Sequence, residues 1–400
     1  MWSRTNGTLG VLFAASVAVS PVLADELKIG LSGGITGGTA GVATEMFNGY
    51  KFAVKQVNDQ GGILDGKTLV GVVSDDGCTP QQAVDSTTKL VNVSQVLAIA
   101  GPFCSGALIT AANSVTIPAG IVLVSPGATS PEVTKLKDND SVFRTVASDI
   151  QQASALAHYL LEKGTMSIAV SFVNVDYGRG LAEAFKVAYE AGGGTIAGYA
   201  GHEEKKPSYR SDLAELARGG ADTLVLFDYA DTSGVTVLRE AIENGFFTNF
   251  YGPDGMRAST LIKVIGADNL TNLFVTTAVG EKSEALEIFR EGFKEFGGDP
   301  SGTFVDTSYD AAFVLALAIE KAGGDKNKLS EALREVANGP GEIIRPGEWK
   351  KAKELISTGK DINYRGASGE IDFDDNGDVT GTIGIFKVNG DDFEVIDEVK

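Results

Sequence analysis

Short apolar stretches alternate with amphipathic helical stretches along most of the chain, and this alternation constrains the fold most strongly. Apolar runs of about four to six residues are typical of buried parallel strands, and helices between them cross over the sheet. The pattern starts at residue 25 and restarts near residue 146, and no Pro/Ser-rich linker separates the two parts. The sequence therefore predicts two α/β units in tandem, each a mainly parallel sheet flanked by helices.

The expected strands of the two units are 27–31, 68–73, 97–100, 121–124, 167–172, 194–198, 223–227 and 249–252. The expected helices are 44–60, 81–93, 106–116, 150–162, 180–191, 212–218, 235–244, 283–296, 309–322 and 329–337. Hairpin strands are expected within 369–398.

The first 24 residues have the pattern of a secretory signal peptide. Arg4 makes the start positive, an apolar run follows at 8–19, and small residues precede the junction between Ala24 and Asp25. A membrane-spanning helix needs about 18 or more apolar residues, so an N-terminal anchor is the weaker alternative. We expect cleavage after Ala24 and an exported, periplasmic product.

Charge and composition favour binding of a small solute over other functions. The chain has 34 Lys and Arg against 53 Asp and Glu, a net charge of −19. Nucleic acid and anionic membrane surfaces attract clustered basic residues, so neither is an expected partner. With 2 histidines the chain has little for a zinc enzyme or histidine-based acid–base catalysis. We expect no cofactor and no metal.

Cys78 and Cys104 are the two cysteines of the chain. An exported protein can keep a disulfide. In the loop-entropy model, the loop that such a bridge closes would stabilise the folded state by about 3 kcal/mol. Two buried free thiols are the alternative that the residues leave open.

Two literal motif matches lie in the wrong structural context. Residues 61–68 match a phosphate-binding P-loop, but a helix precedes and a strand follows, the reverse of what phosphate binding needs. Residues 30–34 match the nucleophile elbow around Ser32, but about ten Gly- and Thr-rich residues delay the next helix. A serine hydrolase therefore stays a remote alternative.

Residues 372–377 match the first half of a calcium-binding EF-hand loop, but Ile383 occupies the position of the bidentate Glu. Asn376-Gly377 instead favours a type I′ turn between strands at 370–373 and 382–386.

Three loops of the first unit follow strands and precede helices, where open α/β folds bind ligands. They are 32–41, 101–106 and 125–131, rich in Gly, Ser and Thr. The hydroxyls of Ser105 and Thr129, with nearby amides, could hold a carboxylate. Ordinary helix N-capping is the alternative for both.

Loops of the second unit that also follow strands contain Tyr177, Tyr229 and Asp254. Asp254 could meet a cationic amine, and the tyrosines could cover an apolar part of a ligand. The alternatives are a turn aspartate and lobe packing.

The order and spacing of several segments resemble a known family. The chain is similar to the periplasmic leucine/isoleucine/valine-binding proteins, the substrate-binding proteins of branched-chain amino acid ABC transporters. The segments that carry this resemblance are 57–63, 75–83, 101–105, 125–131, 177–182, 252–255 and 309–311.

The resemblance implies a two-lobed clamshell with three hinge crossings and a Cys78–Cys104 disulfide. The implied lobes are 25–145 with 277–378, and 146–276 with 379–400. It also implies a receptor that closes on an amino acid and delivers it to ABC permease subunits in the inner membrane. Positions that match ligand-binding residues of the family are Ser105, Ala128 and Thr129 for the carboxylate, Asp254 for the amine, Tyr177 as a cover, and Tyr229 or Ala230.

Two positions depart from the family pattern. Asp254 stands where Glu is usual, and Val42 stands where an aromatic residue lines the side-chain subsite. Another small carboxylate or amide, such as an aromatic acid, is therefore an alternative ligand, and a periplasmic sensor is an alternative role.

Overall fold

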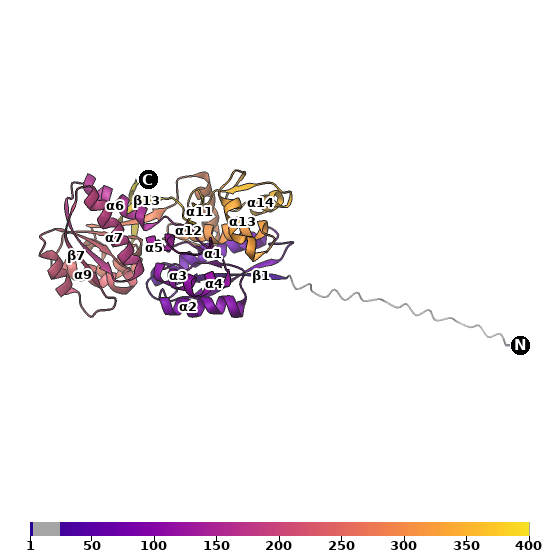
Figure 1. Ribbon diagram of the computed structural model, residues 1–400, viewed down its shortest axis with the longest axis horizontal. Helices are drawn as coiled ribbons and strands as arrows, with labels where there is room; N and C mark the ends of the chain where they lie inside the picture. The colour runs from indigo at the N-terminus through magenta and orange to yellow at the C-terminus, as the bar shows by residue number, and fades with distance from the viewer. Residues whose placement is uncertain (3–24, 400) are drawn as a thin grey trace.

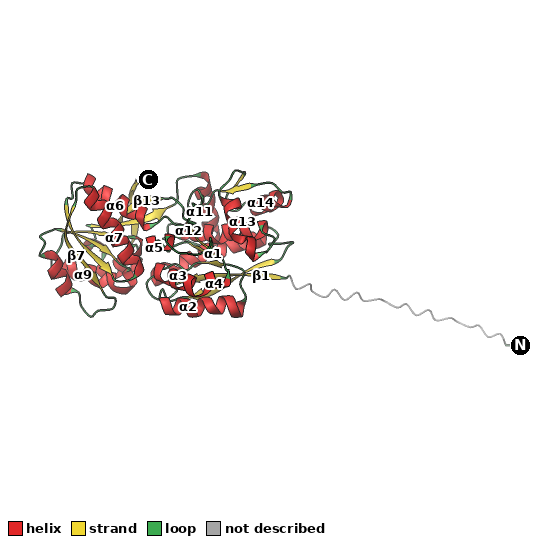
Figure 2. Ribbon diagram, viewed as in Figure 1, coloured by secondary structure: helices red, strands yellow, loops and turns green. Residues whose placement is uncertain are grey.

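The computed structural model describes residues 1–2 and 25–399, and residues 25–399 form two lobes side by side (Figure 1). The predicted signal peptide therefore lies almost wholly outside the described residues. In each lobe, helices flank a central sheet (Figure 2). No helix in the described part is both long and apolar enough to cross a membrane.

Within residues 25–399, the sheet of the first lobe has five parallel strands in the order β2-β1-β3-β4-β5. Apolar side chains are buried on both faces of β4 and β5, as short continuous runs predict, whereas the edge strand β2 is only partly buried. Its strands are β1 (Glu26–Gly33), β2 (Thr68–Asp75), β3 (Ile99–Ala100), β4 (Leu123–Ser125) and β5 (Val142–Arg144).

The sheet of the second lobe has the order β14-β13-β10-β9-β8-β6-β7 among the described residues. The strands from β7 to β10 are parallel, and β13 and β14 add an antiparallel edge. The strands are β6 (Ser167–Val173), β7 (Thr195–His202), β8 (Thr223–Phe227), β9 (Asn249–Gly252), β10 (Leu273–Val279), β13 (Thr382–Asn389) and β14 (Asp392–Val399).

Helices from two distant parts of the chain complete the first lobe. The rings of Phe52, Phe289, Phe293 and Tyr309 pack together where α1, α11 and α12 meet. The elements are α1 (Ala40–Asp59), α2 (Pro80–Lys89), η1 (Leu90–Ser94), α3 (Ser105–Ala111), η2 (Ala112–Thr116), α4 (Ile117–Ala119), α5 (Pro131–Thr134), α11 (Glu284–Phe296), α12 (Val305–Lys321), η6 (Lys326–Lys328), α13 (Leu329–Ala337) and α14 (Trp349–Ser357), with the parallel pair β11 (Glu342–Ile344) and β12 (Ile362–Tyr364).

The second lobe is built from the middle of the chain and its C-terminal hairpin. Its helices are α6 (Asp149–Glu162), α7 (Asp176–Ala191), α8 (Arg210–Ala217), η3 (Ala230–Gly234), α9 (Val235–Glu243), η4 (Asp254–Met256), α10 (Ser259–Ile265) and η5 (Ala267–Asn269). Within the described chain, the backbone crosses between the lobes three times: after β5, after β10 and before β13. The two-lobed α/β prediction is thus confirmed.

The predicted hairpin around Asn376-Gly377 is wrong. Strand β13 pairs with β14 and β10, and of the expected strand 370–373 only Glu370 forms a bridge, to Arg365. The Asp374 carboxylate accepts the backbone N–H groups of Asn376 and Asp378, which closes the turn locally. The turn then packs on β5, where the Gly377 carbonyl accepts the backbone N–H of Arg144 at 3.0 Å.

The P-loop match lies in the context that the sequence predicts. Residues 61–68 lie between the end of α1 and the start of β2, so no helix N-terminus follows to hold a phosphate. In the described residues no group of three or more His, Cys, Asp or Glu side chains could hold a metal.

A Cys78–Cys104 disulfide joins the loop after β2 to the start of α3, with the two Cα atoms 5.4 Å apart. This confirms the pairing that the resemblance implied. The bridge therefore ties together two loops that border the space between the lobes.

Breaking this disulfide should lower the free energy of unfolding of the mature protein by about 3 kcal/mol, because the unfolded chain regains the entropy of an open loop. Urea denaturation with and without reductant measures the change. The Cys78→Ser/Cys104→Ser variant is the control, since reductant should not shift its midpoint. Equal midpoints for the oxidised and reduced wild type would contradict the prediction.

Candidate functional site

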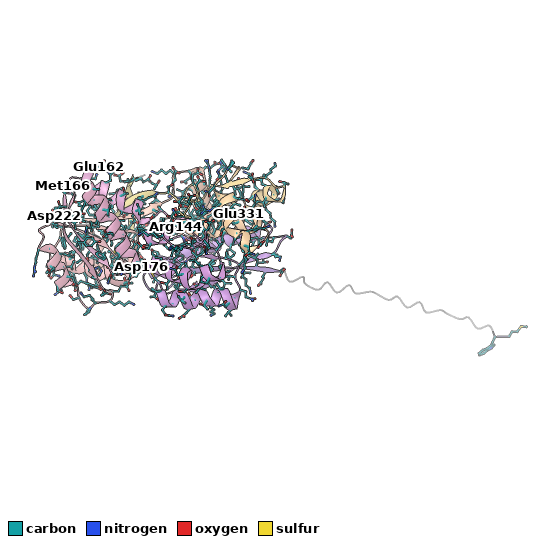
Figure 3. The ribbon with its side chains drawn as sticks, in the orientation of Figure 1. Arg144, Glu162, Met166, Asp176, Asp222 and Glu331 are labelled. Carbon is teal, nitrogen blue, oxygen red and sulfur yellow. A yellow bond between two sulfur atoms is a disulfide. The ribbon has the colours of Figure 1, made fainter. Side chains whose placement is uncertain are left out.

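The carboxyl ends of strands from both sheets face the boundary between the lobes, and the predicted ligand loops lie there. Figure 3 places Arg144 and Asp176 near this boundary, whereas Glu162 and Asp222 lie toward the far end of the second lobe. A small cavity between the lobes is lined from the first lobe by Thr39, Val42, Met46, Phe103, Gly127, Thr303 and Phe304, and from the second by Tyr177, Tyr229, Asp231, Asp254, Gly255 and Ala258.

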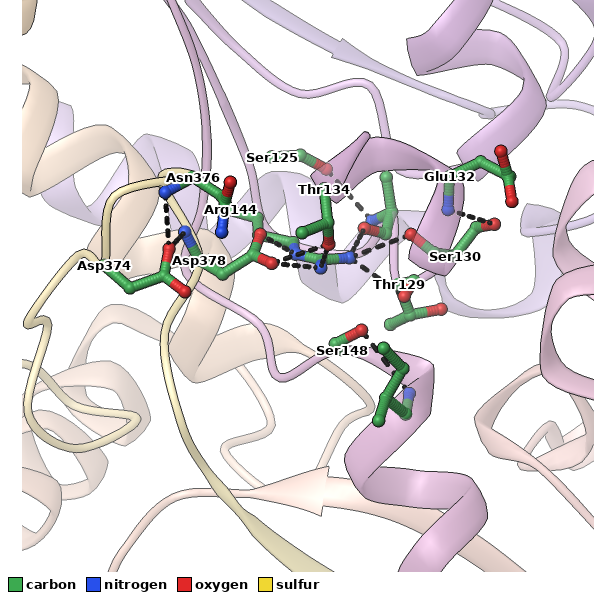
Figure 4. Close-up of polar contacts among 12 residues, drawn as sticks. Ser125, Thr129, Ser130, Glu132, Thr134, Arg144, Ser148, Asp374, Asn376 and Asp378 are labelled. Atoms are coloured by element: carbon green, nitrogen blue, oxygen red, sulfur yellow. Dashed lines mark hydrogen bonds and ion pairs between the residues drawn. The ribbon is translucent and has the colours of Figure 1, made fainter. Parts of the chain in front are cut away.

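A fully buried arginine fixes the shape of the loop 125–131 (Figure 4). Arg144 Nη1 donates to the backbone carbonyls of Ala128, Thr129 and Ser130 at 3.3, 2.9 and 3.1 Å. Its Nε and Nη2 donate to the two carboxylate oxygens of Asp378 at 2.5 and 2.7 Å. Such bidentate pairing is strong and directional, so the loop is held rigidly against the third crossing.

The predicted carboxylate-binding residues lie together in the first lobe. Ser105 Oγ accepts the backbone N–H of Ser130 at 3.1 Å, so the hydroxyl hydrogen of Ser105 points elsewhere. The Ala128 N–H donates to Ser125 Oγ at 3.0 Å, and the Ala128 carbonyl accepts a hydrogen bond from Arg144. The buried Thr129 hydroxyl has no partner within hydrogen-bond distance among the residues described, but it lies close enough to Asp149 to lower the pKa of that carboxyl. The alternative of N-capping is wrong for Ser105 and Thr129, because Cys104 and Ser130 occupy those cap positions.

Asp254 and Tyr177 form a hydrogen-bonded pair on the second lobe. The Tyr177 hydroxyl donates to Asp254 Oδ1 at 3.0 Å and accepts the Gly255 N–H at 3.2 Å. The Tyr177 ring stacks on Tyr229, with the ring centroids 4.6 Å apart. Tyr229 in turn lies against Gly38, where an added Cβ would come within 3.1 Å of the ring. A side chain at position 38 would hold the lobes apart.

A buried Ser171–His202–Asp228 chain positions Tyr229. Ser171 Oγ lies 2.9 Å from His202 Nδ1, and His202 Nε2 lies 2.9 Å from Asp228 Oδ2. The other Asp228 oxygen accepts the backbone N–H of Tyr229 at 2.7 Å and the hydroxyl of Ser233 at 2.8 Å. These contacts fix the start of the loop that carries Tyr229.

Ser32 does not meet a histidine. Its hydroxyl donates to Asp76 Oδ2 at 3.0 Å, and both groups are buried. His202 is bound to Ser171 and Asp228, and the exposed His158 lies 3.2 Å from Glu162. The arrangement that a serine hydrolase needs is therefore absent around Ser32 in the described chain.

Asp149, the first residue of α6, is a site residue that the sequence reasoning missed. Its carboxylate is fully buried, and neither oxygen has a hydrogen-bond partner within residues 25–399. Its backbone N–H donates to the Thr129 carbonyl at 2.9 Å, which places it beside the loop held by Arg144. An acidic residue in the first turn of a helix is common, so the sequence pattern gives no sign of this burial.

Asp254 lines the cavity, and the buried Asp149 lies close enough for the charges of the two carboxylates to interact. Burial raises the pKa of Asp254 to about 6. Burial, and then the negative charge of Asp254, raise the pKa of Asp149 well above its ordinary value. Burial also raises the pKa values of Tyr177 and Tyr229, and both acids add to these shifts. The Thr129 hydroxyl and the charge of Arg144 offset part of the rise in the pKa of Asp149, but Arg144 is itself paired with Asp378.

The lobes are closed on each other. The cavity between them measures about 30 Å³, room for a few water molecules. Arg257 of the second lobe reaches the loop before α12, where its Nη2 donates to the Ser301 carbonyl at 2.8 Å and its Nη1 to Thr303 Oγ1 at 3.2 Å. The lobes must part before a solute of amino-acid size can enter. A larger hollow of about 640 Å³ on the hinge side is not lined by any predicted ligand residue in the described chain.

A family model described as "Periplasmic binding protein" matches residues 26–392. The chain belongs to the periplasmic binding protein family. It is 30% identical to the leucine-, isoleucine-, valine-, threonine- and alanine-binding protein of Pseudomonas aeruginosa, over 83% of this chain and 88% of that protein.

Two solved structures have a similar fold. The branched-chain amino acid transporter substrate-binding protein LivJ from Streptococcus pneumoniae, in complex with isoleucine, has a TM-score of 0.77 at 23% identity and covers 93% of this chain and 99% of that chain. A solute-binding protein of an ABC transporter from R. palustris, in complex with benzoate, has a TM-score of 0.76 at 17% identity and covers 93% and 96%.

Replacing Asp378 by Asn should lower the free energy of unfolding by about 3 kcal/mol, because Arg144 would stay buried without its charge partner. Urea denaturation followed by circular dichroism measures this change. The exposed Asp375→Asn is the matched control and should differ from the wild type by no more than about 0.5 kcal/mol. Equal losses in the two variants would refute a special role for the Arg144–Asp378 pair.

Proposed function

We propose that this periplasmic binding protein is the exported receptor of an ABC importer and captures an α-amino acid by closing its two lobes. The observation that carries the proposal is the pair of buried carboxylates, Asp149 and Asp254, at the lobe boundary. Two carboxylates in a low-dielectric site are unfavourable unless a cation joins them. The ammonium group of an amino acid supplies that cation.

In this proposal the ligand carboxylate binds the first lobe at Ser105, Ala128 and Thr129. The unpartnered Thr129 hydroxyl and the Ser105 hydroxyl hydrogen are available donors there. The ligand ammonium then meets Asp254 and Asp149 from the second lobe. Closure removes water, which strengthens both charged contacts.

The side chain of the ligand would lie among Val42, Met46, Phe103, Phe304 and Ala258, with Tyr177 and Tyr229 as the cover. These groups are apolar or aromatic, which suits a branched-chain side chain. The same rings also suit an aromatic acid, so an amine-free carboxylate is the second candidate ligand.

We propose lobes at 25–145 with 277–378 and at 146–276 with 379–400, joined by the three crossings. Cleavage after Ala24 would release the protein into the periplasm, where the closed form would present its surface to permease subunits in the inner membrane. The absence of a histidine partner for Ser32 among the described residues favours a receptor that performs no catalysis.

Asp254→Asn should weaken the binding of leucine, isoleucine or valine by about 10- to 100-fold, because a charge-assisted hydrogen bond to the ammonium is lost. Isothermal titration calorimetry on protein refolded from denaturant, which removes carried ligand, measures this. Asp222→Asn, at the far end of the same lobe in Figure 3, is the control and should leave affinity unchanged.

The same two variants should be titrated with benzoate. If benzoate binds the wild type and no amino acid does, the ligands are amine-free acids and the proposed ligand class is wrong. Equal amino-acid affinities in the wild type and Asp254→Asn would remove the assigned role of Asp254.

Binding of the amino acid should weaken below about pH 6. A raised carboxyl pKa means that the free protein holds a proton at Asp254 below pH about 6, and the ammonium must displace it. Each pH unit below this value should raise Kd by up to about tenfold, with Asp149 adding to the effect. Calorimetry at about pH 5 and about pH 7.5, in two buffers of different ionisation enthalpy, measures affinity and proton release together. A Kd that stays constant across this range would contradict the assignment.

A further inference from the structure

Asp231 lines the cavity between the lobes, but its carboxylate binds groups of the protein itself. It sits in η3 of the second lobe, and its Oδ2 accepts the backbone N–H of Gly41 in the first lobe at 2.7 Å. Its Oδ1 accepts the Thr260 hydroxyl at 2.7 Å, within its own lobe. The carboxylate is therefore oriented by the second lobe before it meets the first.

The partner of Asp231 is the start of α1. Gly41 is the second residue of this 20-residue helix, and the N-cap residue Thr39 makes no side-chain capping bond. The first N–H groups of a helix need acceptors from outside it and attract negative charge. In the closed form, the second lobe supplies the acceptor that the sequence of the first lobe omits.

The glycine at position 41 leaves the space that this contact needs. A Cβ added to Gly41 would lie 2.6 Å from Asp231 Oδ2, closer than real contacts allow. Alanine is otherwise favoured over glycine inside a helix, so the first lobe has no local reason for glycine here. The close approach of Asp231 gives that reason.

We propose that Asp231 and the N–H of Gly41 form a latch that holds the closed form and sets affinity without selecting the ligand. It goes beyond the proposed function, on which it rests only in that binding needs closure. A latch differs from a ligand contact in one measurable way: its loss weakens every ligand by the same factor.

The test uses Asp231→Ala, Gly41→Ala and the double variant, with the exposed Asp268→Ala as a charge-matched control on the same lobe. Each single variant should raise Kd about tenfold, equally for leucine, isoleucine and valine. The double variant should be no weaker than Asp231→Ala, because the added methyl then meets no carboxylate. Asp268→Ala should bind as the wild type does.

Small-angle X-ray scattering of the ligand-free proteins separates failure of the latch from failure of the proposed ligand. Asp231→Ala and Gly41→Ala should have larger radii of gyration than the wild type and Asp268→Ala. Equal radii would overturn the latch, whatever the ligand is. Two other outcomes would also overturn the latch and identify Asp231 as a ligand contact. One is a loss of affinity in Asp231→Ala that differs among ligands, and the other is additive losses in the double variant.

Discussion

The contacts of Arg144 are the constraint on which the ligand loop and the hinge both depend. A buried guanidinium must be neutralised and fully hydrogen-bonded, and here one face of it meets Asp378 while the other meets three loop carbonyls. Arg144 ends β5 next to the first crossing, and Asp378 lies just before the third. One ion pair thus joins the ligand loop to two of the three segments about which the lobes move.

The two lobes hold their parts of the candidate site in different ways. The first-lobe loop is held by Arg144, Ser125 and Ser105 through backbone groups, which do not depend on side-chain identity. Across the boundary, Asp254 and Tyr177 present side chains that are held mainly by each other and by the adjacent Gly255. The first-lobe part is therefore fixed through its backbone, and the second-lobe part depends on side-chain contacts.

Much of the fold could be predicted from sequence because the spacing of apolar residues within each helix or strand is a local property of the chain. The helix 329–337 and the strands 223–227 and 249–252 lie where the apolar pattern predicts them. The pattern missed β10 and α14. It expected hairpin strands within 369–398 but put the turn at 376–377, whereas β13 turns back into β14 at 390–391 and its other edge pairs with the distant β10. Arg144 and Asp149 were missed for a related reason. The partner of Arg144 is 234 residues away, and Asp149 is buried against the first-lobe loop at Thr129, a contact between lobes that no local pattern records.

The closed form is balanced between attraction and repulsion across one boundary. The hydrogen bonds of Asp231 and Arg257 draw the lobes together at the cleft, and neither involves a solute. Asp149 and Asp254 weaken closure around an empty site without abolishing it, since two carboxylates repel and lose water there. A cation between them reverses the sign of that interaction. Because the attractive contacts already exist, a solute need only remove the repulsion, so a small ligand can shift a large movement.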